Sequence, residues 1–282
     1  MDNISAAFVP TQFLTIGGRN LAYRIIGNGQ PMIWCNRFRG TLDDWDPGFI
    51  DQLAHSFQVI IFDYSGVGLS SGELPTKIAS VADDLKDLAD GLKIQQFIIG
   101  GWSYGGTVAQ TFTVRFPERV SHAILIGTSP AGKNKNYPEH LFMETSSHIV
   151  NDYEDQVILF FEPKSENSRK AATSSLERIA QRKSDHDVPV PEQVWGRYFE
   201  GVADFAADHA DTRHKLAKLS VPVLVISGDH DLVCPVENWY ALTRIMPNLY
   251  INVLPDSGHG PQHQYPTLSV RYINDFIRFN GQ

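Results

Sequence analysis

Five short apolar runs constrain this chain more than any other feature of its sequence. Each is nearly continuous in Val, Ile, Leu or other apolar residues, so both faces of an extended segment would be buried. The runs span residues 31–35, 58–64, 96–102, 122–127 and 221–227. Strands of this kind are typical of a parallel sheet that helices cover on both sides. The pattern therefore predicts an α/β fold.

Segments with helical periodicity separate these runs. Apolar residues recur at helical spacing from residue 78 to residue 92. Further helices are predicted over 107–116, 235–246 and 267–279. Three more strands are predicted over 12–17, 21–26 and 250–254, the first two as a hairpin. Because strands and helices alternate, we expect a mostly parallel eight-stranded sheet with right-handed crossovers and helices on both faces.

One interval, residues 131–219, contains no convincing strand. It is too long for a structureless loop in a compact domain, and helical patterns occur near 147–161, 165–183 and 191–208. We interpret it as a helical lid inserted into a core made of residues 1–130 and 220–282. Its aromatic residues should mostly pack the insert onto the core, while a few line a pocket. The candidates for substrate contact are Phe142, Phe161, Trp195, Tyr198 and Phe199.

A Gly-x-Ser-x-Gly motif at residues 101–105 stands between a predicted strand and a predicted helix. The pattern alone is weak, but in this context it is typical of a sharp turn that exposes a nucleophile. Glycine is needed two residues before and after Ser103, where neighbouring backbones crowd. Ser103 would then project above the sheet, with the Tyr104 amide placed to donate to an oxyanion.

A serine nucleophile needs a base, and the base needs an orienting acid. Asp229 and Asp231 follow the strand predicted at 221–227, and His259 follows the one at 250–254. The carboxyl ends of parallel strands meet at one edge of a sheet, so these side chains can approach Ser103. The order Ser, Asp, His matches hydrolases with a nucleophile elbow.

These motifs resemble those of the α/β-hydrolase fold superfamily, in particular its serine hydrolases with a helical lid. The resemblance also includes residues 63–72, similar to the family's D-x-x-G-x-G-x-S turn, and residues 228–235 and 257–259, similar to its acid and histidine loops. It implies Ser103 as nucleophile, His259 as base and Asp231 as orienting acid. Asp229 competes for the acid role and His263 for that of the base.

The first oxyanion donor departs from the family pattern. By position Asn36 and Arg37 replace the family's His-Gly, so the donor would be the amide of Phe38. Arg37 cannot adopt a positive φ as cheaply as glycine. The departure also brings Arg37 and Arg39 near the entrance. They either pair with Asp43, Asp44 or Asp46, or one of them recognises a carboxylate or polar acyl group.

The composition of the chain limits the kinds of partner that we expect it to bind. With 24 Lys and Arg against 32 Asp and Glu, the net charge is −8, which argues against nucleic acid. No apolar stretch is long enough to span a membrane, and the N-terminus lacks the pattern of a secretory signal. Two cysteines, Cys35 and Cys234, fit reduced core positions in the cytoplasm. We expect no metal and no cofactor, and a homodimer is compatible with the sequence.

The sequence thus predicts a serine hydrolase that cleaves an ester, lactone or related acyl bond of a small, mostly apolar substrate through an acyl-enzyme. Ser103 argues against epoxide hydrolases and haloalkane dehalogenases, which use a carboxylate nucleophile. C–C bond hydrolases, aminopeptidases and cofactor-free haloperoxidases keep a serine there and stay open. A ligand-sensing protein with little turnover is a further alternative.

Overall fold

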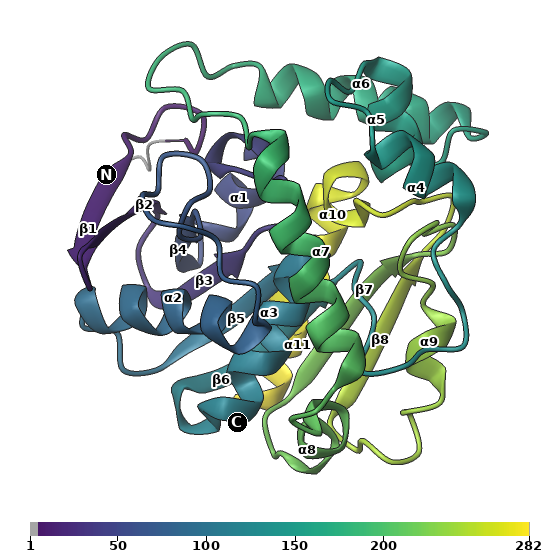
Figure 1. Ribbon diagram of the computed structural model, residues 1–282. Coiled ribbons are helices and arrows are strands. Elements are labelled where there is room, and N and C mark those ends of the chain that lie inside the picture. Colours follow the sequence, from purple (N-terminus) through teal and green to yellow (C-terminus); the bar gives the residue numbers. More distant parts are fainter. Residues whose placement is uncertain (1–4, 282) are drawn as a thin grey trace.

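The computed structural model describes residues 5–281, which form an eight-stranded sheet with the order β1-β2-β4-β3-β5-β6-β7-β8 (Figure 1). The strands are β1 Gln12–Ile16, β2 Arg19–Ile26, β3 Gln30–Cys35, β4 Phe57–Phe62, β5 Phe97–Trp102, β6 Val120–Ile126, β7 Val223–Gly228 and β8 Leu249–Leu254. β1 pairs antiparallel with β2, and β2 with β4. All pairings from β4 onward are parallel. The expected sheet is confirmed.

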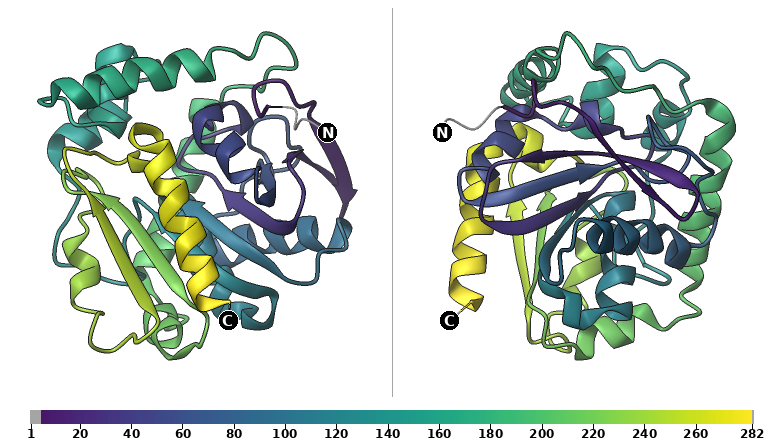
Figure 2. Two further views of the ribbon diagram at one scale, coloured as in Figure 1. Left: turned by 180° about the vertical axis from the view of Figure 1, so that it is seen from behind. Right: turned by 90° about the vertical axis from the view of Figure 1, so that its left-hand side faces the viewer.

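Helices cover both faces of the sheet because strand residues alternate between two apolar clusters. On β3, Ile33 and Cys35 belong to one cluster, and Met32 and Trp34 belong to the other. The first face packs against α2 (Ile78–Gly91) and α3 (Tyr104–Arg115). The second packs against α1 (Pro47–Leu53) and α11 (Pro266–Asn280), which crosses the rear face in Figure 2. This double burial explains the continuous apolar runs.

Several helices differ from the sequence prediction. The helix expected over 235–246 is reduced to α9 (Glu237–Tyr240), followed by turns. The short helices α1 and α10 (Pro261–Gln264) were not predicted. A helix expected over 147–161 begins only at Tyr153, because the side chain of Asp152 caps it by accepting a hydrogen bond from the Asp155 amide at 2.9 Å. Within residues 5–281 no helix is long and apolar enough to cross a membrane.

The inserted region lies between β6 and β7 and is helical, as expected. Its helices are α4 His140–Ser146, α5 Tyr153–Phe160, α6 Glu166–Ile179, α7 Glu192–Ala207 and α8 Thr212–Lys218. In Figure 1, α4, α5 and α6 lie across the top of the molecule, while α7 runs down its front. We call residues 131–219 the cap and the remainder the core.

Polar contacts fasten the cap to the core. Asp46, fully buried at the start of α1, accepts hydrogen bonds from Arg178 at 2.6 Å and Ser175 at 2.7 Å, both on α6. At the other end of the cap, Arg213 of α8 donates to the carbonyl of Ala131 and, at 2.6 Å, to Asn134. The two ends of the insertion are therefore held next to each other.

The connection between α6 and α7 makes a further contact with the core. Asp187 accepts a hydrogen bond from the Leu42 amide at 3.0 Å. Its carboxylate also faces the buried carboxyl of Asp63, and both approach Gly68, whose φ is 55°. Burial and then the neighbouring Asp187 raise the pKa of Asp63 well above its usual value. Two carboxyl groups thus meet where the cap touches the core.

Candidate active site

Ser103 lies at a strained turn between β5 and α3. Its φ of 56° and ψ of −118° fall outside the regions that non-glycine residues usually occupy. A Cβ on Gly101 would lie 2.3 Å from the carbonyl oxygen of Gly105, and one on Gly105 would lie 2.0 Å from that of Cys35. Only glycine fits these two positions. The sequence motif therefore reflects the packing of this turn.

The loops after β7 and β8 bring an acid and a histidine to Ser103. His259 Nε2 lies 2.7 Å from Ser103 Oγ, and His259 Nδ1 lies 2.9 Å from Asp231 Oδ2. Burial alone would raise the pKa of the Asp231 carboxyl, but His259 and two backbone amides outweigh it and hold the pKa below its usual value. These amides belong to Val233 and Cys234, 3.0 and 2.8 Å away. Asp231 is thus held as a carboxylate facing the imidazole.

The two competing residues occupy other positions. Asp229 accepts a hydrogen bond from the Ser257 amide at 3.1 Å and lies 2.8 Å from His230, so it supports the loop that carries His259. His263 is buried on α10, 4.7 Å from the Trp102 ring centroid. Burial lowers the pKa of His263 to about 4. Neither residue contacts the Ser103 hydroxyl.

His259 is enclosed by aromatic rings. Phe142 of α4 meets it edge-on with ring centroids 5.5 Å apart, and Phe160 of α5 lies parallel at 6.5 Å. The Trp102 indole donates to the His259 carbonyl at 2.8 Å. The histidine is 2% exposed. Both core and cap therefore fix the orientation of the imidazole.

The loop after β3, which carries the predicted oxyanion donor Phe38, is closed by the side chain of Asn36. The Asn36 side chain accepts from the Arg37 amide at 2.8 Å and donates to the Thr41 carbonyl at 2.7 Å, which closes the loop. The residue with a positive φ is Arg39, at 58°, so Arg37 does not need the conformation of glycine. Tyr104 is the first residue of α3, and its amide has no acceptor within that helix.

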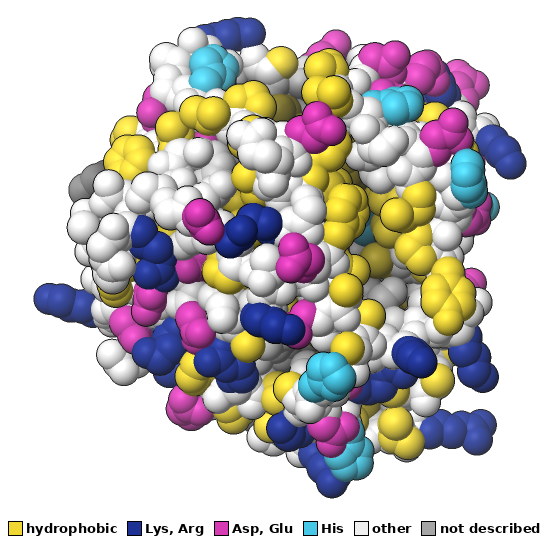
Figure 3. Space-filling model, in the orientation of Figure 1, with side chains coloured by type: hydrophobic (Ala, Val, Ile, Leu, Met, Phe, Trp, Pro, Cys, Tyr) yellow, Lys and Arg dark blue, Asp and Glu magenta, His cyan; other side chains and the backbone are white. Residues whose placement is uncertain are grey.

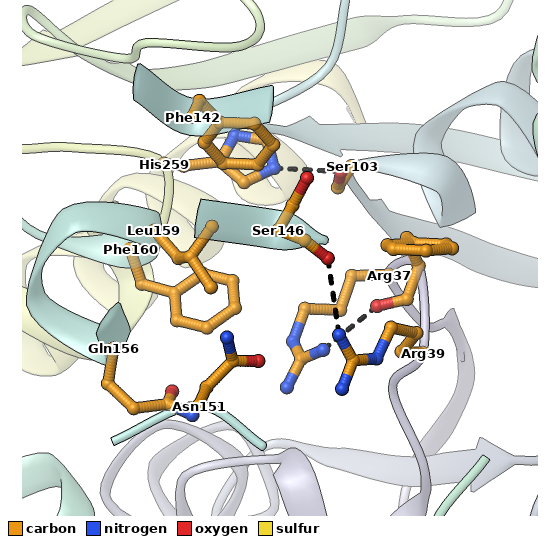
Figure 4. Close-up of a pocket in the computed structure, with 11 residues that line it drawn as sticks. Arg37, Arg39, Ser103, Phe142, Ser146, Asn151, Gln156, Leu159, Phe160 and His259 are labelled. Carbon is orange, nitrogen blue, oxygen red and sulfur yellow. Dashed lines mark hydrogen bonds between the residues drawn. The ribbon is translucent and has the colours of Figure 1, made fainter. Parts of the chain in front are cut away.

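Two cavities meet at Ser103, and both are also lined by Phe38, Phe142 and Ser146. The large lobe has a volume of about 410 Å³ and is mostly apolar. It extends between α3 and α7, where hydrophobic side chains gather in a hollow of the surface (Figure 3). The small lobe, about 50 Å³, lies between α5 and the loop after β3 (Figure 4). Besides Ser103, Ser146 and His259, its polar lining comprises Arg37, Arg39, Asn151 and Gln156.

The comparisons with known proteins agree with this architecture. A family model described as alpha/beta hydrolase fold matches residues 30–266. The chain belongs to the alpha/beta hydrolase fold family. An alpha/beta hydrolase fold protein from Chitinophaga pinensis has a TM-score of 0.88 and 30% identity, over 97% of this chain and 99% of that one.

Other relatives of this alpha/beta hydrolase differ in activity. A proline iminopeptidase of Pestalotiopsis fici is 24% identical, over 94% of this chain and 99% of the relative. A thermophilic esterase from Thermogutta terrifontis, solved with malate bound, shares 23% identity and a TM-score of 0.72 over the full length of both chains. The substrate of this hydrolase must therefore be inferred from its own cavity.

The predicted substrate-contact residues of the hydrolase fall into two groups. Arg37 and Phe142 line the small lobe, and Phe142 and Phe199 line the large one. Phe161, Trp195 and Tyr198 are buried and line neither lobe. Tyr198 packs edge-on against Phe38, and Trp195 stacks on Arg39. These two residues therefore contact Phe38 and Arg39, which line the lobes, and do not line a lobe themselves.

Sequence reasoning did not find Asn151, Gln156 or Leu159, which also line the small lobe. These residues lie on α5 or just before it and belong to no sequence motif. The lobe forms only because α5 packs near the loop after β3, so the sequence did not indicate that they line it. Both cysteines are free, Cys35 buried and Cys234 partly exposed. Among residues 5–281, no group of three or more His, Cys, Asp or Glu side chains is arranged to hold a metal ion.

Proposed function

We propose that this alpha/beta hydrolase is a serine hydrolase that cleaves an ester or related acyl bond through Ser103, His259 and Asp231. The observation that carries the proposal is the continuous contact from Ser103 Oγ to His259 Nε2 at 2.7 Å and from His259 Nδ1 to Asp231 at 2.9 Å. Ser103 also has a strained backbone, with a positive φ. A non-glycine residue keeps such a conformation only where the surrounding structure enforces it.

The chemistry follows from this geometry. His259 takes the proton of Ser103 while Oγ bonds to the acyl carbon, and the amides of Tyr104 and Phe38 donate to the oxyanion. The imidazolium then gives that proton to the leaving oxygen as the carbon–oxygen bond breaks. Water attacks the acyl-enzyme by the same route in reverse and releases the acid. Asp231 keeps Nδ1 protonated, so that Nε2 faces the serine.

The shape of the cavity supports an apolar acyl group. The large lobe is lined by Tyr104, Phe199 and Phe205 among others, and it reaches Ser103 from the side of α3 and α7. A site of this kind buries apolar substrate and leaves orientation to a few polar groups. The cap closes over the lobe, so we propose that it selects the substrate as a lid does.

Labelling with a fluorophosphonate tests the proposal directly. The probe should attach to the wild-type enzyme at Ser103 and fail to label Ser103→Ala. Turnover of the best substrate from a panel of esters, lactones, thioesters, peptides and vinylogous diketones should fall by several orders of magnitude in that variant. Ser80→Ala, an exposed serine on α2, serves as the control. Labelling or turnover that survives in Ser103→Ala would refute the mechanism.

A further inference from the structure

The guanidinium groups of two arginines line the small lobe, and they differ in the groups that accept their hydrogen bonds. Arg37 lies 2.6 Å from the carboxylate of Asp44 and donates to the Phe38 carbonyl at 2.9 Å. Arg39 instead donates to the carbonyls of Ser146, His148 and Ile149, at 2.9 to 3.2 Å. Among residues 5–281, no carboxylate oxygen lies within 4.0 Å of the Arg39 guanidinium. The lobe is therefore lined by two cations, of which only Arg37 is paired with a carboxylate.

Both cations are held rigidly. Arg37 lies over the rings of Phe160 and Trp102, at 4.6 and 5.3 Å from their centroids. Arg39 lies 3.8 Å from the centroid of Trp195. Its backbone is in the left-handed region, which costs free energy for a side chain of this kind. Fixed guanidinium groups lose little entropy when they bind an anion.

The lobe also holds a donor that no protein group satisfies. The Nε of Arg37 is buried and has no hydrogen-bond partner. Such an orphaned donor costs free energy unless a ligand or water accepts from it. Burial and then the charge of Arg37 lower the pKa of Arg39, so the unbound lobe disfavours its own positive charge. An anion bound in the lobe would stabilise the positive charge of Arg39 and pair with the guanidinium groups that line it.

The position of His259 identifies which part of a substrate enters this lobe. His259 lines the small lobe and is absent from the lining of the large one. The leaving oxygen must lie next to His259, which protonates it. The leaving group therefore extends toward Arg37 and Arg39, and the acyl group toward α3 and α7. Figure 4 shows both guanidinium groups side by side across the lobe from Asn151.

From this arrangement we propose that the small lobe recognises a carboxylate on the leaving group, with Arg39 as the specificity-determining residue. The inference rests on the proposed hydrolase function and specifies its substrate class: apolar acyl esters of short hydroxy acids. The volume of about 50 Å³ restricts the leaving group to a few heavy atoms. Ser103 would take the acyl group, and the hydroxy acid would depart with the proton from His259.

A matched pair of substrates tests this assignment. Butanoyloxyacetate and butanoyloxyacetamide carry the same acyl group, and their leaving groups differ in charge with little change in size. The ratio of their kcat/KM values, acetate over acetamide, is measured for the wild type and for variants. Arg39→Gln should lower the ratio roughly 10-fold or more, mainly through KM, since a charge-assisted hydrogen bond is lost. Asp44→Asn should raise it, because Arg37 is then unpaired.

Arg197→Gln provides the control. Arg197 is an arginine of the cap that binds Glu73 at 2.9 Å and lines neither lobe, so its removal should leave the ratio unchanged. A ratio that is unchanged in both Arg39→Gln and Asp44→Asn would overturn the assignment. Failure of the hydrolase proposal looks different, because neither substrate would then be cleaved and the fluorophosphonate would not label Ser103.

A second measurement decides the case in which Arg39→Gln fails to fold. In the wild type, KM for butanoyloxyacetate should rise with sodium chloride concentration, while KM for butanoyloxyacetamide stays constant. Equal responses of the two substrates to salt would overturn the assignment without use of any variant.

Discussion

Asp229 and Asp231 lie two residues apart in one loop, yet their carboxylates have different partners. Asp231 contacts the imidazole of His259, whereas Asp229 contacts the Ser257 amide and His230. Because a strand has just ended, the loop turns between them and points the two side chains in different directions. Their roles can therefore be separated by single substitutions.

Asp231→Asn should lower kcat on an ester by about 10⁴-fold, because the amide stabilises the wrong tautomer of His259. Asp229→Asn should cost less than about 10-fold, since it weakens one hydrogen bond to the loop backbone. Steady-state kinetics on the best ester measures both. The reverse order would assign the orienting role to Asp229.

The pair formed by Asp63 and Asp187 makes stability depend on pH. The pKa of Asp63 is raised in the folded protein, so its stabilising contribution is complete below the unfolded value near 3.8 and is lost as pH rises through the folded pKa. Arg24 lowers this pKa only in part. Within that window, one proton changes the free energy of unfolding by up to about 1.4 kcal/mol per pH unit.

Asp63→Asn should remove this dependence, because the amide stays neutral. Urea unfolding between pH 4 and pH 9 should show a wild-type stability that falls with rising pH relative to that of the variant. Asp83→Asn removes one exposed carboxylate from α2 and is the matched control. Parallel pH profiles for wild type and Asp63→Asn would show that the pKa of Asp63 is not raised in the folded protein.

At the scale of elements, α6 anchors the cap to the core through Arg178. Removing this guanidinium leaves the carboxylate of Asp46 buried with Ser175 and the Gly48 amide as partners. Arg178→Gln should therefore lower the free energy of unfolding by about 2–3 kcal/mol. Arg169→Gln, on the same helix, removes a solvent-screened pair with Glu154 and should leave the free energy of unfolding nearly unchanged. Urea midpoints compare them, and equal losses would contradict the anchoring role.

The elements that the sequence predicted well are those defined by local pattern. The strands agree within a few residues because burial on both faces imposes apolar residues throughout. The start of α5 at Tyr153 was missed, although Asp152 and Asp155 form a capping box there. The short helix α1 was missed because seven residues carry too little periodicity. The local hydrophobic pattern therefore predicts that a helix or strand exists, whereas the residue at which a helix begins or ends depends on its capping residues.

The same distinction applies to the site. Ser103, Asp231 and His259 could be placed from motifs because each follows a strand of the sheet, and parallel strands end at one edge. Trp195 and Tyr198 were predicted to contact substrate together with Phe199, but of these three only Phe199 lines a lobe, since α7 turns the other two toward the core. The sequence placed Arg37 and Arg39 near the entrance, but it did not indicate that Asn151 and Gln156 lie opposite them, since Arg39 and Gln156 are 117 positions apart.

At the scale of the whole molecule, the large lobe exists only where cap and core meet. Phe199 is 49% exposed and lines that lobe, so Phe199→Ala should leave the urea midpoint unchanged and shift the preference among acyl chain lengths by roughly 10-fold. Phe13→Ala removes an equally exposed ring on β1, outside both lobes, and should change neither. The measurement is kcat/KM for p-nitrophenyl esters from acetate to decanoate. An unchanged profile in Phe199→Ala would contradict selection by the cap.

Arg213 ties the first residues of the insertion to its last helix through Ala131 and Asn134. The chain therefore leaves the sheet and returns to it through one narrow neck. The residues that we propose to perform the reaction lie on the sheet side of this neck, and the cap residues that we propose to distinguish one acyl chain from another lie beyond it. Such an arrangement would let the cap be exchanged as a unit in evolution, so that specificity changes while the proposed catalytic residues are kept.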